Sequence, residues 1–213
     1  MRFTSFMGFT SEPGVGDLDP DSDTPEGRAT KRYLHHFASH PEAGRIYWGK
    51  VIERPEEHWL FIDMDHALLR PPNIEYHPRS CLTDPWPPDV LAEAPVTQVL
   101  MLFFPSDLDD AAFNSLTIQF EGFKTKALDQ APDCRGVAYG WSTDGDVPVM
   151  GQPGRTGTVL MAFVGWPSVE AHVAFRQTEL FRENIALLKG MKDLIIKLDY
   201  FHLACKSLEV PDN

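Results

Sequence analysis

The segment GTVLMAFVGW, residues 157–166, constrains the fold more than any other stretch of this sequence. It has the length of a strand and is apolar on both of its faces, so both faces must be buried. Pro167 and Ser168 follow it, and apolar residues then recur at helical spacing. Ser168 is a natural N-cap, and we expect its helix to continue to about Gly190. The pattern predicts a buried strand followed by an amphipathic helix.

Other strands and helices are expected along the chain from their apolar periodicity. The strands are predicted at 2–10, 45–53, 58–65, 97–104, 135–143 and 193–208. Helices are predicted at 24–39 and 108–128, where Thr24 and Asp107 are candidate caps. Residues 144–156 are rich in glycine and are expected to form a hairpin loop.

Two pairs of predicted strands resemble each other in the two halves of the chain. The sequence IYWG at 46–49 matches VAYG at 137–140, and LFIDM at 60–64 matches AFVGW at 162–166. Both pairs follow a predicted helix in the same order. We therefore predict an α+β fold with two ferredoxin-like βαββαβ modules, of which the first is degenerate. Two such sheets can close on each other as a pseudo-dimeric α/β barrel and bury both faces of their strands.

The modules are expected at residues 1–68 and 96–210, joined by a proline-rich connection at 69–95. Seven prolines in this connection argue against a continuous helix or a central strand. We expect it to cross the surface, with one short helical turn near residues 89–92. The first module is expected to lack the second helix of the βαββαβ unit.

Charge and cysteine content exclude several classes of function. The formal net charge of −12 argues against binding to nucleic acid or to an anionic membrane surface. The three cysteines have no metal-binding spacing and suggest a reducing compartment. The sequence also has no signal-peptide pattern and no apolar run long enough to span a bilayer. We expect a cytoplasmic monomer or homodimer that binds a hydrophobic small molecule.

The run FVGWPSVEAHVAF at Phe163–Phe175 resembles the antibiotic-biosynthesis-monooxygenase type of dimeric α/β barrel. The tandem arrangement is similar to two-module fungal members and to stress-responsive barrels of that superfamily. The resemblance implies this fold, and activities that range from cofactor-free oxygenation to cyclisation, lactone isomerisation and haem chemistry. It also implies that Phe175 and Phe181 occupy the positions of the Tyr and His that a plant polyketide cyclase uses. His172 lies near the position of the haem ligand in another branch.

Four residues are candidates for catalysis. Asp63 shares a strand face with Trp59 and Phe61, where burial would raise its pKa; alternatively, it is solvated at a frayed strand end. His172 is either a general base or a helix-surface residue. Two further candidates, Tyr200 and His202, share a face of the last strand and either orient a substrate oxygen or only pack in the core.

Eight aromatic residues on the central strands are candidates for an apolar substrate pocket: Tyr47, Trp48, Trp59, Phe61, Tyr139, Trp141, Phe163 and Trp166. Alternatively, they only pack the barrel. No metal site is expected, because His36 and His40 lack a third ligand and the residues 63–66 lack ligand spacing. No nucleotide, serine-hydrolase or zinc-protease motif occurs.

These observations lead to one main hypothesis and two alternatives. The main hypothesis is a cofactor-independent cyclase or isomerase, a Diels–Alder type of pericyclase included, for a hydrophobic polyketide or terpenoid intermediate. Holding a reactive conformer dominates such reactions, so few acid–base groups are needed. The alternatives are a cofactor-free monooxygenase and a non-catalytic ligand-binding or stress-response protein.

Overall fold

The computed structural model describes residues 2–64 and 79–208. The helices of this part are α1 (Pro25–Ala38), α2 (Val90–Glu93), α3 (Asp110–Phe123), which continues as a π-helical turn over Lys124–Leu128, α4 (Val169–Phe175) and α5 (Glu179–Lys189). Its strands are β1 (Phe3–Thr10), β2 (Ala43–Val51), β3 (Glu57–Met64), β4 (Arg79–Asp84), β5 (Val96–Phe104), β6 (Val137–Ser142), β7 (Val147–Pro148), β8 (Thr156–Trp166) and β9 (Lys197–Leu208).

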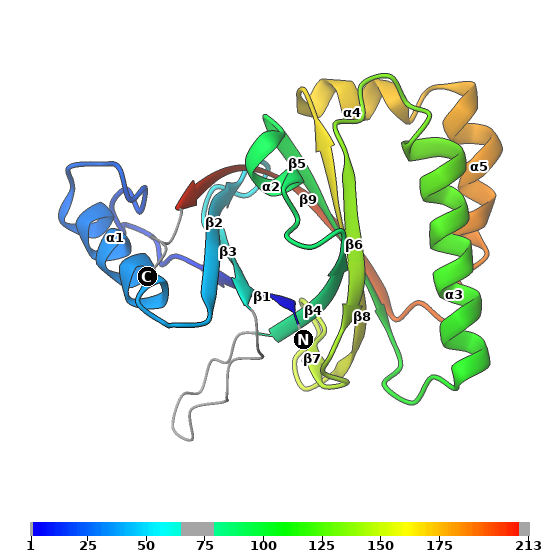
Figure 1. Cartoon of the computed structure of the whole chain (residues 1–213), viewed down its shortest axis with the longest axis horizontal. Coiled ribbons are helices and arrows are strands. Elements are labelled where there is room, and N and C mark those ends of the chain that lie inside the picture. The colour runs from blue at the N-terminus through cyan, green and yellow to red at the C-terminus, as the bar shows by residue number, and fades with distance from the viewer. Residues whose placement is uncertain (1, 65–78, 209–213) are drawn as a thin grey trace.

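The strands form a closed antiparallel barrel. Its order is β5-β9-β2-β3-β1-β4-β6-β8, and β8 pairs with β5 to complete the circle, while the short β7 extends β8 outside it. Figure 1 shows α1 outside one half of the barrel and α3 and α5 outside the other. The predicted α+β pseudo-dimeric barrel is therefore confirmed.

The two halves of the barrel have the same internal order. β2-β3-β1-β4 and β6-β8-β5-β9 each place the second, third, first and fourth strands of a ferredoxin-like unit side by side. Each fourth strand pairs with the second strand of the other half, β4 with β6 and β9 with β2. The duplicated IYWG and VAYG sequences thus lie in β2 and β6, which form the two junctions between the halves.

The glycine of each repeated sequence sits at one of these junctions. A Cβ on Gly140 would lie 1.6 Å from the Leu82 carbonyl oxygen of β4, a separation that no side chain permits. A Cβ on Gly49 would lie 3.3 Å from the Leu203 Cβ of β9. Glycine is usually unfavourable inside a strand. The close approach of the two halves explains why glycine occupies these two positions.

Each strand divides its side chains between the barrel interior and the helices, because successive residues point to opposite faces. The interior cluster includes Phe61 and Phe163, which are both fully buried. On the outer face, Trp48 packs with α1 and Trp141 packs with α3. Both faces of β8 are buried, as its sequence predicted.

Three local predictions differ from the structure. Asp109, not Asp107, caps α3, because its carboxylate accepts a hydrogen bond from the Ala112 amide at 2.7 Å. The helix expected from Ser168 to Gly190 is two helices, because Thr178 caps a new helix by accepting a hydrogen bond from the Phe181 amide at 3.2 Å. The stretch 79–84, expected to cross the surface, forms β4 between β1 and β6. Six residues without proline separate Pro78 from Pro85, so every amide in β4 can donate to a neighbour.

Other expectations for this region have mixed outcomes. The short helical turn expected near 89–92 is present as α2. The helix expected to be missing from the first module falls at 65–78, outside the described residues. The module boundaries 1–68, 69–95 and 96–210 stay predictions, although β4, the fourth strand of the first half, lies within 69–95. In the described ranges, no helix combines the length and the apolar character needed to cross a membrane.

The N-cap of α4, predicted from the sequence, can be tested directly. The Ser168 hydroxyl accepts a hydrogen bond from the Ala171 amide at 3.2 Å. Ser168→Ala should lower the free energy of unfolding by about 1 kcal/mol, because one first-turn amide loses its acceptor. Urea denaturation checks this, with Ser168→Asp as a control that restores an acceptor and should retain most of the stability.

Candidate active site

A cavity of about 670 Å³ lies at one end of the barrel. We call it the mouth cavity. Its apolar floor includes Phe6, Trp59 and Met101 from β1, β3 and β5, and residues 147–156 of the β7 hairpin form its opposite wall. This volume suits a small organic molecule, and the apolar lining suits a hydrophobic one.

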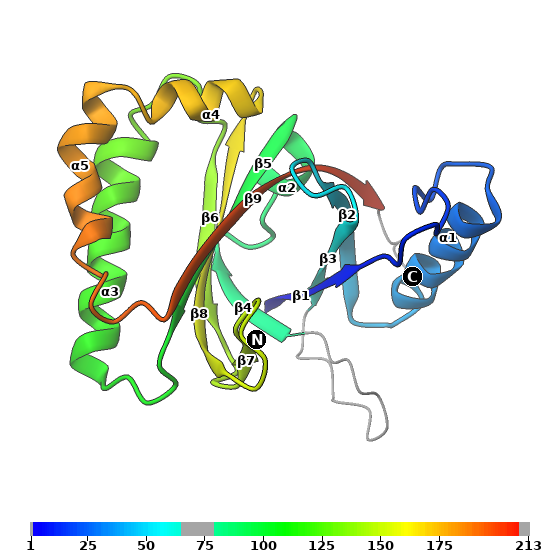
Figure 2. The same ribbon diagram turned by 180° about the vertical axis from the view of Figure 1, so that it is seen from behind.

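Aromatic and aliphatic side chains pack together in the barrel interior beyond the mouth cavity. Trp59 stacks on Phe201 with ring centroids 4.9 Å apart, and Phe61 meets Phe163 edge to face at 5.0 Å. At the opposite end, Val90 and Leu91 of α2 pack into the same interior cluster. Figure 2 shows the two ends of the barrel from behind, with the β7 hairpin in front. The interior therefore opens at the mouth cavity and is filled towards α2.

Asp63 lies in the filled part of the interior and is 1% exposed. The Tyr47 hydroxyl donates to Asp63 Oδ2 at 2.8 Å, and the Thr4 hydroxyl lies 3.5 Å from Oδ1. Thr4 in turn shares a hydrogen bond of 3.0 Å with Thr83 of β4. The side chain at position 63 is therefore held by neighbours on β1 and β2, and Thr4 links it to β4.

The environment of Asp63 changes its ionisation. Burial raises the pKa of Asp63 to about 7, although the hydrogen bond from Tyr47 and the charge of Arg45 act in the opposite direction. Burial and the adjacent carboxyl group of Asp63 also raise the pKa of Tyr47. Both forms of Asp63 are populated near neutral pH, which suits a group that accepts and returns a proton.

Arg45 connects this polar group to α2. Its guanidinium donates to Asp89 Oδ1 at 2.8 Å and also interacts with Tyr47. Asp89 immediately precedes α2, so the ion pair ties the helix to the end of the barrel near Asp63. Asp63 does not line the mouth cavity. It is four positions along the extended strand from Trp59, a separation of roughly 13 Å.

His172, His202 and Glu53 form a second group, the histidine network, on the outer face of the barrel. His172 Nδ1 lies 2.8 Å from His202 Nε2, and His202 Nδ1 donates to the Glu53 carboxylate. Glu53 Oε2 also accepts from the His202 backbone amide at 3.0 Å. Trp166 stacks on the His172 ring with centroids 5.3 Å apart. Both histidines are buried, at 5% and 2% exposure.

The carboxylate fixes the proton arrangement of the histidine network. A carboxylate only accepts, so His202 carries its proton on Nδ1; when His202 is neutral, its Nε2 accepts from His172 Nδ1. Burial, followed by repulsion from His202 and Arg176, lowers the pKa of His172 to about 4. Burial acts to raise the pKa of Glu53, but the hydrogen bonds from His202 outweigh it and the pKa is lowered.

The structure separates the four candidate catalytic residues into two places. Asp63 faces the barrel interior, whereas His172 and His202 lie together in the histidine network outside it. Tyr200 is 38% exposed near them, and its hydroxyl accepts from Arg176 at 3.0 Å. Asp63 and the histidine network therefore cannot act together on one bound molecule, and their roles stay predictions.

The candidate substrate-binding residues also divide into two groups. Four face the barrel interior: Tyr47, Trp59, Phe61 and Phe163, of which Trp59 lines the mouth cavity. The other four pack on the outer face beneath the helices: Trp48, Tyr139, Trp141 and Trp166. Strand alternation is the reason, because Trp48 and Trp166 are one residue out of phase with the inward positions of β2 and β8.

Several residues of these sites were missed in the sequence. Residues 147–156 looked like a hairpin loop, and no periodic pattern marks them as a cavity wall. Arg45 could have been found, because it shares a strand parity with Tyr47. Glu53 could not, because its partner His202 is 149 residues away along the chain.

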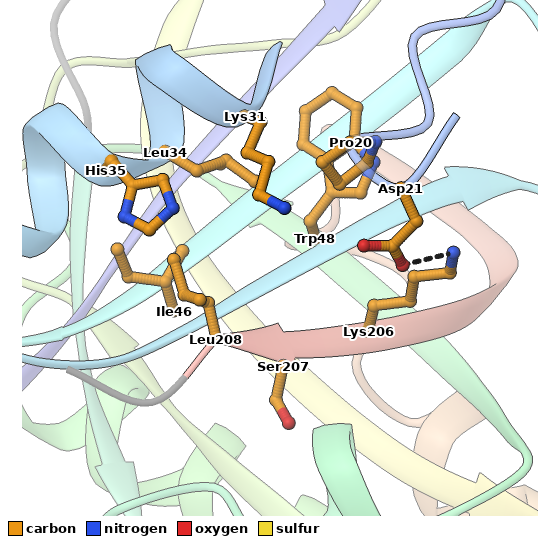
Figure 3. Close-up of a pocket in the computed structure, with 10 residues that line it drawn as sticks. All are labelled: Pro20, Asp21, Lys31, Leu34, His35, Ile46, Trp48, Lys206, Ser207 and Leu208. Atoms are coloured by element: carbon orange, nitrogen blue, oxygen red, sulfur yellow. Dashed lines mark hydrogen bonds and ion pairs between the residues drawn. The ribbon is translucent and has the colours of Figure 1, made fainter. Parts of the chain in front are cut away.

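A smaller pocket of about 80 Å³ lies between α1 and the outer face of β2 and β9 (Figure 3). Leu34, Ile46 and Trp48 contribute apolar surface, and Lys206 is held by Asp19 and Asp21 at 2.8 and 2.9 Å. Among residues 2–64 and 79–208, no group of three or more His, Cys, Asp or Glu side chains is arranged to hold a metal ion. Residues 65 and 66 of the weak 63–66 motif fall outside the described part.

Solved structures share this architecture. An anthrone oxidase-like protein superposes with a TM-score of 0.60 and 12% identity, over 99% of this chain and 94% of that chain. Two proposed monooxygenases give TM-scores of 0.55 and 0.54: one from Fusobacterium nucleatum (8% identity, 98% of this chain, 94% of the other) and one from Lactobacillus acidophilus (9%, 98% and 96%). No protein-family model matches the sequence, and no curated protein sequence does either.

These likenesses and the strand order define the class of fold. The chain has a dimeric α/β-barrel fold, with two ferredoxin-like halves supplied by one polypeptide. At 8–12% identity the likeness concerns the fold alone.

Proposed function

We propose that this protein is a cofactor-independent cyclase or isomerase that binds a hydrophobic small molecule in the mouth cavity. The observation that carries the proposal is the cavity itself: about 670 Å³ at the open end of an otherwise packed barrel, with Phe6, Trp59 and Met101 as its floor. A flexible apolar chain folded into this space would be held near a reactive conformation. Ring closure or isomerisation of such a chain rearranges bonds within one molecule and needs no co-reactant.

Asp63 is our candidate for a supporting acid–base group. Its pKa of about 7 and its hydrogen bond from Tyr47 favour proton transfer near neutral pH. Because Phe61 and Trp59 lie between Asp63 and the mouth cavity on β3, contact with a substrate requires those rings to move. The histidine network is outside the barrel and has no part in this proposal.

Filling the mouth cavity tests the proposal. Met150→Trp places an indole in the cavity wall and should weaken binding of the neutral fluorophore N-phenyl-1-naphthylamine at least tenfold, because the space for it is occupied. Val173→Trp is the matched control, because it adds the same group at an exposed position of α4. Equal affinity in the two variants would show that the cavity is not the binding site.

Conversion of a substrate is measured by liquid chromatography and mass spectrometry after linear polyketide and terpenoid intermediates are incubated with the protein. A cyclase or isomerase yields a product of unchanged mass and altered retention, and Met150→Trp should abolish its formation. Binding of the fluorophore without conversion of any such intermediate would favour a non-catalytic ligand-binding protein.

A cofactor-free monooxygenase is the second candidate, favoured by the barrel's likeness to an anthrone oxidase-like protein. This activity would consume molecular oxygen and yield a product made heavier by incorporated oxygen. Oxygen uptake with anthrone as the substrate, dependent on an open mouth cavity, would support this candidate over the cyclase.

A further inference from the structure

Among the described residues, three charged side chains belong to the lining of the mouth cavity: Glu57, Arg79 and Arg155. Glu57 accepts from Arg54 Nε at 2.7 Å, and Arg79 donates to Asp146 Oδ1 at 2.6 Å. These two groups are therefore already neutralised by neighbours of opposite charge.

Arg155 differs from them. Its guanidinium donates to the neutral Gln152 Oε1 at 3.0 Å, and no carboxylate pairs with it among residues 2–64 and 79–208. It is exposed and sits beside Gly154, whose φ of +76° turns the chain at the tip of the β7 hairpin. An unneutralised cation at a cavity edge is notable in a chain whose net charge is −12.

We propose that the molecule bound in the mouth cavity is an apolar organic monoanion whose anionic group is bound by Arg155. The inference rests on the proposed function, because it concerns the ligand of the same cavity. The apolar body would lie on Phe6, Trp59 and Met101, and a carboxylate or enolate would reach the guanidinium at the edge. A guanidinium binds a planar oxyanion with two parallel hydrogen bonds, which gives orientation as well as affinity. Orientation is what a cyclisation of a flexible chain requires.

A matched pair of fluorophores tests this inference. The anionic probe is 8-anilinonaphthalene-1-sulfonate, and the neutral probe is N-phenyl-1-naphthylamine, which has the same aromatic body without the sulfonate. Arg155→Gln should weaken binding of the anionic probe about tenfold and leave the neutral probe unchanged, because one charge-assisted contact is lost. Arg155→Lys should retain part of the affinity, and Arg182→Gln, an exposed arginine of α5, should change neither probe.

The two probes separate failure of this inference from failure of the proposed function. If Met150→Trp leaves the neutral probe bound as before, the mouth cavity is not the site and the proposed function fails. If the neutral probe binds in the mouth cavity but Arg155→Gln affects both probes equally, or neither, the assignment of the anion to Arg155 is overturned. The mouth cavity then remains the binding site. Higher salt should weaken the anionic probe in the wild type and have little effect in Arg155→Gln.

Discussion

Asp63→Asn should become more stable relative to the wild type as the pH rises from 4 to 8, by about 3–4 kcal/mol in the free energy of unfolding. The carboxyl is buried, and its pKa is raised from 3.8 to about 7 in the folded protein. Between these values the folded state binds the proton more tightly than the unfolded state. The stability that protonated Asp63 contributes is therefore fully present below pH 4 and is lost as the pH rises through 7.

Asparagine is close in shape to the protonated aspartic acid and keeps an acceptor for the Tyr47 hydroxyl. Urea denaturation of the variant and the wild type at several pH values measures the difference, with the exposed Asp133→Asn as the control. A difference that does not change with pH would contradict the burial of an ionisable group at position 63. If Asp63 is also the acid–base group, the variant should bind N-phenyl-1-naphthylamine normally but lose turnover.

His172→Asn should show the opposite dependence, with its stability relative to the wild type rising by about 3 kcal/mol as the pH falls from 7 to 4. The pKa of His172 is lowered from 6.5 to about 4 in the folded protein. Protons therefore bind the unfolded state preferentially in this range. The stability that neutral His172 contributes is present above pH 6.5 and is lost as the pH falls towards 4.

Asparagine at this position can donate to His202 Nε2 as His172 Nδ1 does, although the ring contact with Trp166 is lost. That loss should lower the free energy of unfolding by a similar amount at all pH values. The test is therefore how the difference between the variant and the wild type changes with pH, and not its absolute size. The control is His36→Asn on the exposed side of α1. Parallel pH profiles for His172→Asn and the wild type would mean that His172 titrates normally in the folded protein.

These two predictions act in the same pH range with opposite sign. Between pH 4 and 7 the wild type loses stability from Asp63 as the pH rises and gains it from His172. The two contributions partly cancel, and each variant removes one of them. The pair of variants therefore reveals titrations that the wild-type profile conceals.

Much of the fold could be predicted because the spacing of apolar residues along short segments indicates the strands and helices. Residues 157–166 are apolar on both faces, which already required a layer on each side of the strand. The duplicated sequences at 46–49 and 137–140 predicted two similar halves, and their glycines lie where those halves meet. The break at Thr178 between α4 and α5 was missed, because the apolar periodicity continues through it.

The candidate site was less predictable than the fold. The parity of Asp63 with Phe61 and Trp59 indicated an interior carboxyl, and its burial agrees with that reading. Periodicity could not decide which face of a doubly buried strand points into the barrel. Trp48 and Tyr47 are neighbours in the sequence, yet they lie on opposite sides of the barrel wall.

The sequence by itself determined the strands, most of the helices and the need for two halves to cover each other, because these depend on the spacing of apolar residues along short segments. The tertiary structure alone decided that residues 147–156 close over Phe6 and Trp59, and that Glu53 meets His202 from 149 residues away. The physical reason is that the spacing of apolar residues along a segment shows which side chains are buried. The neighbours that bury them depend on how strands distant in the sequence pair with one another.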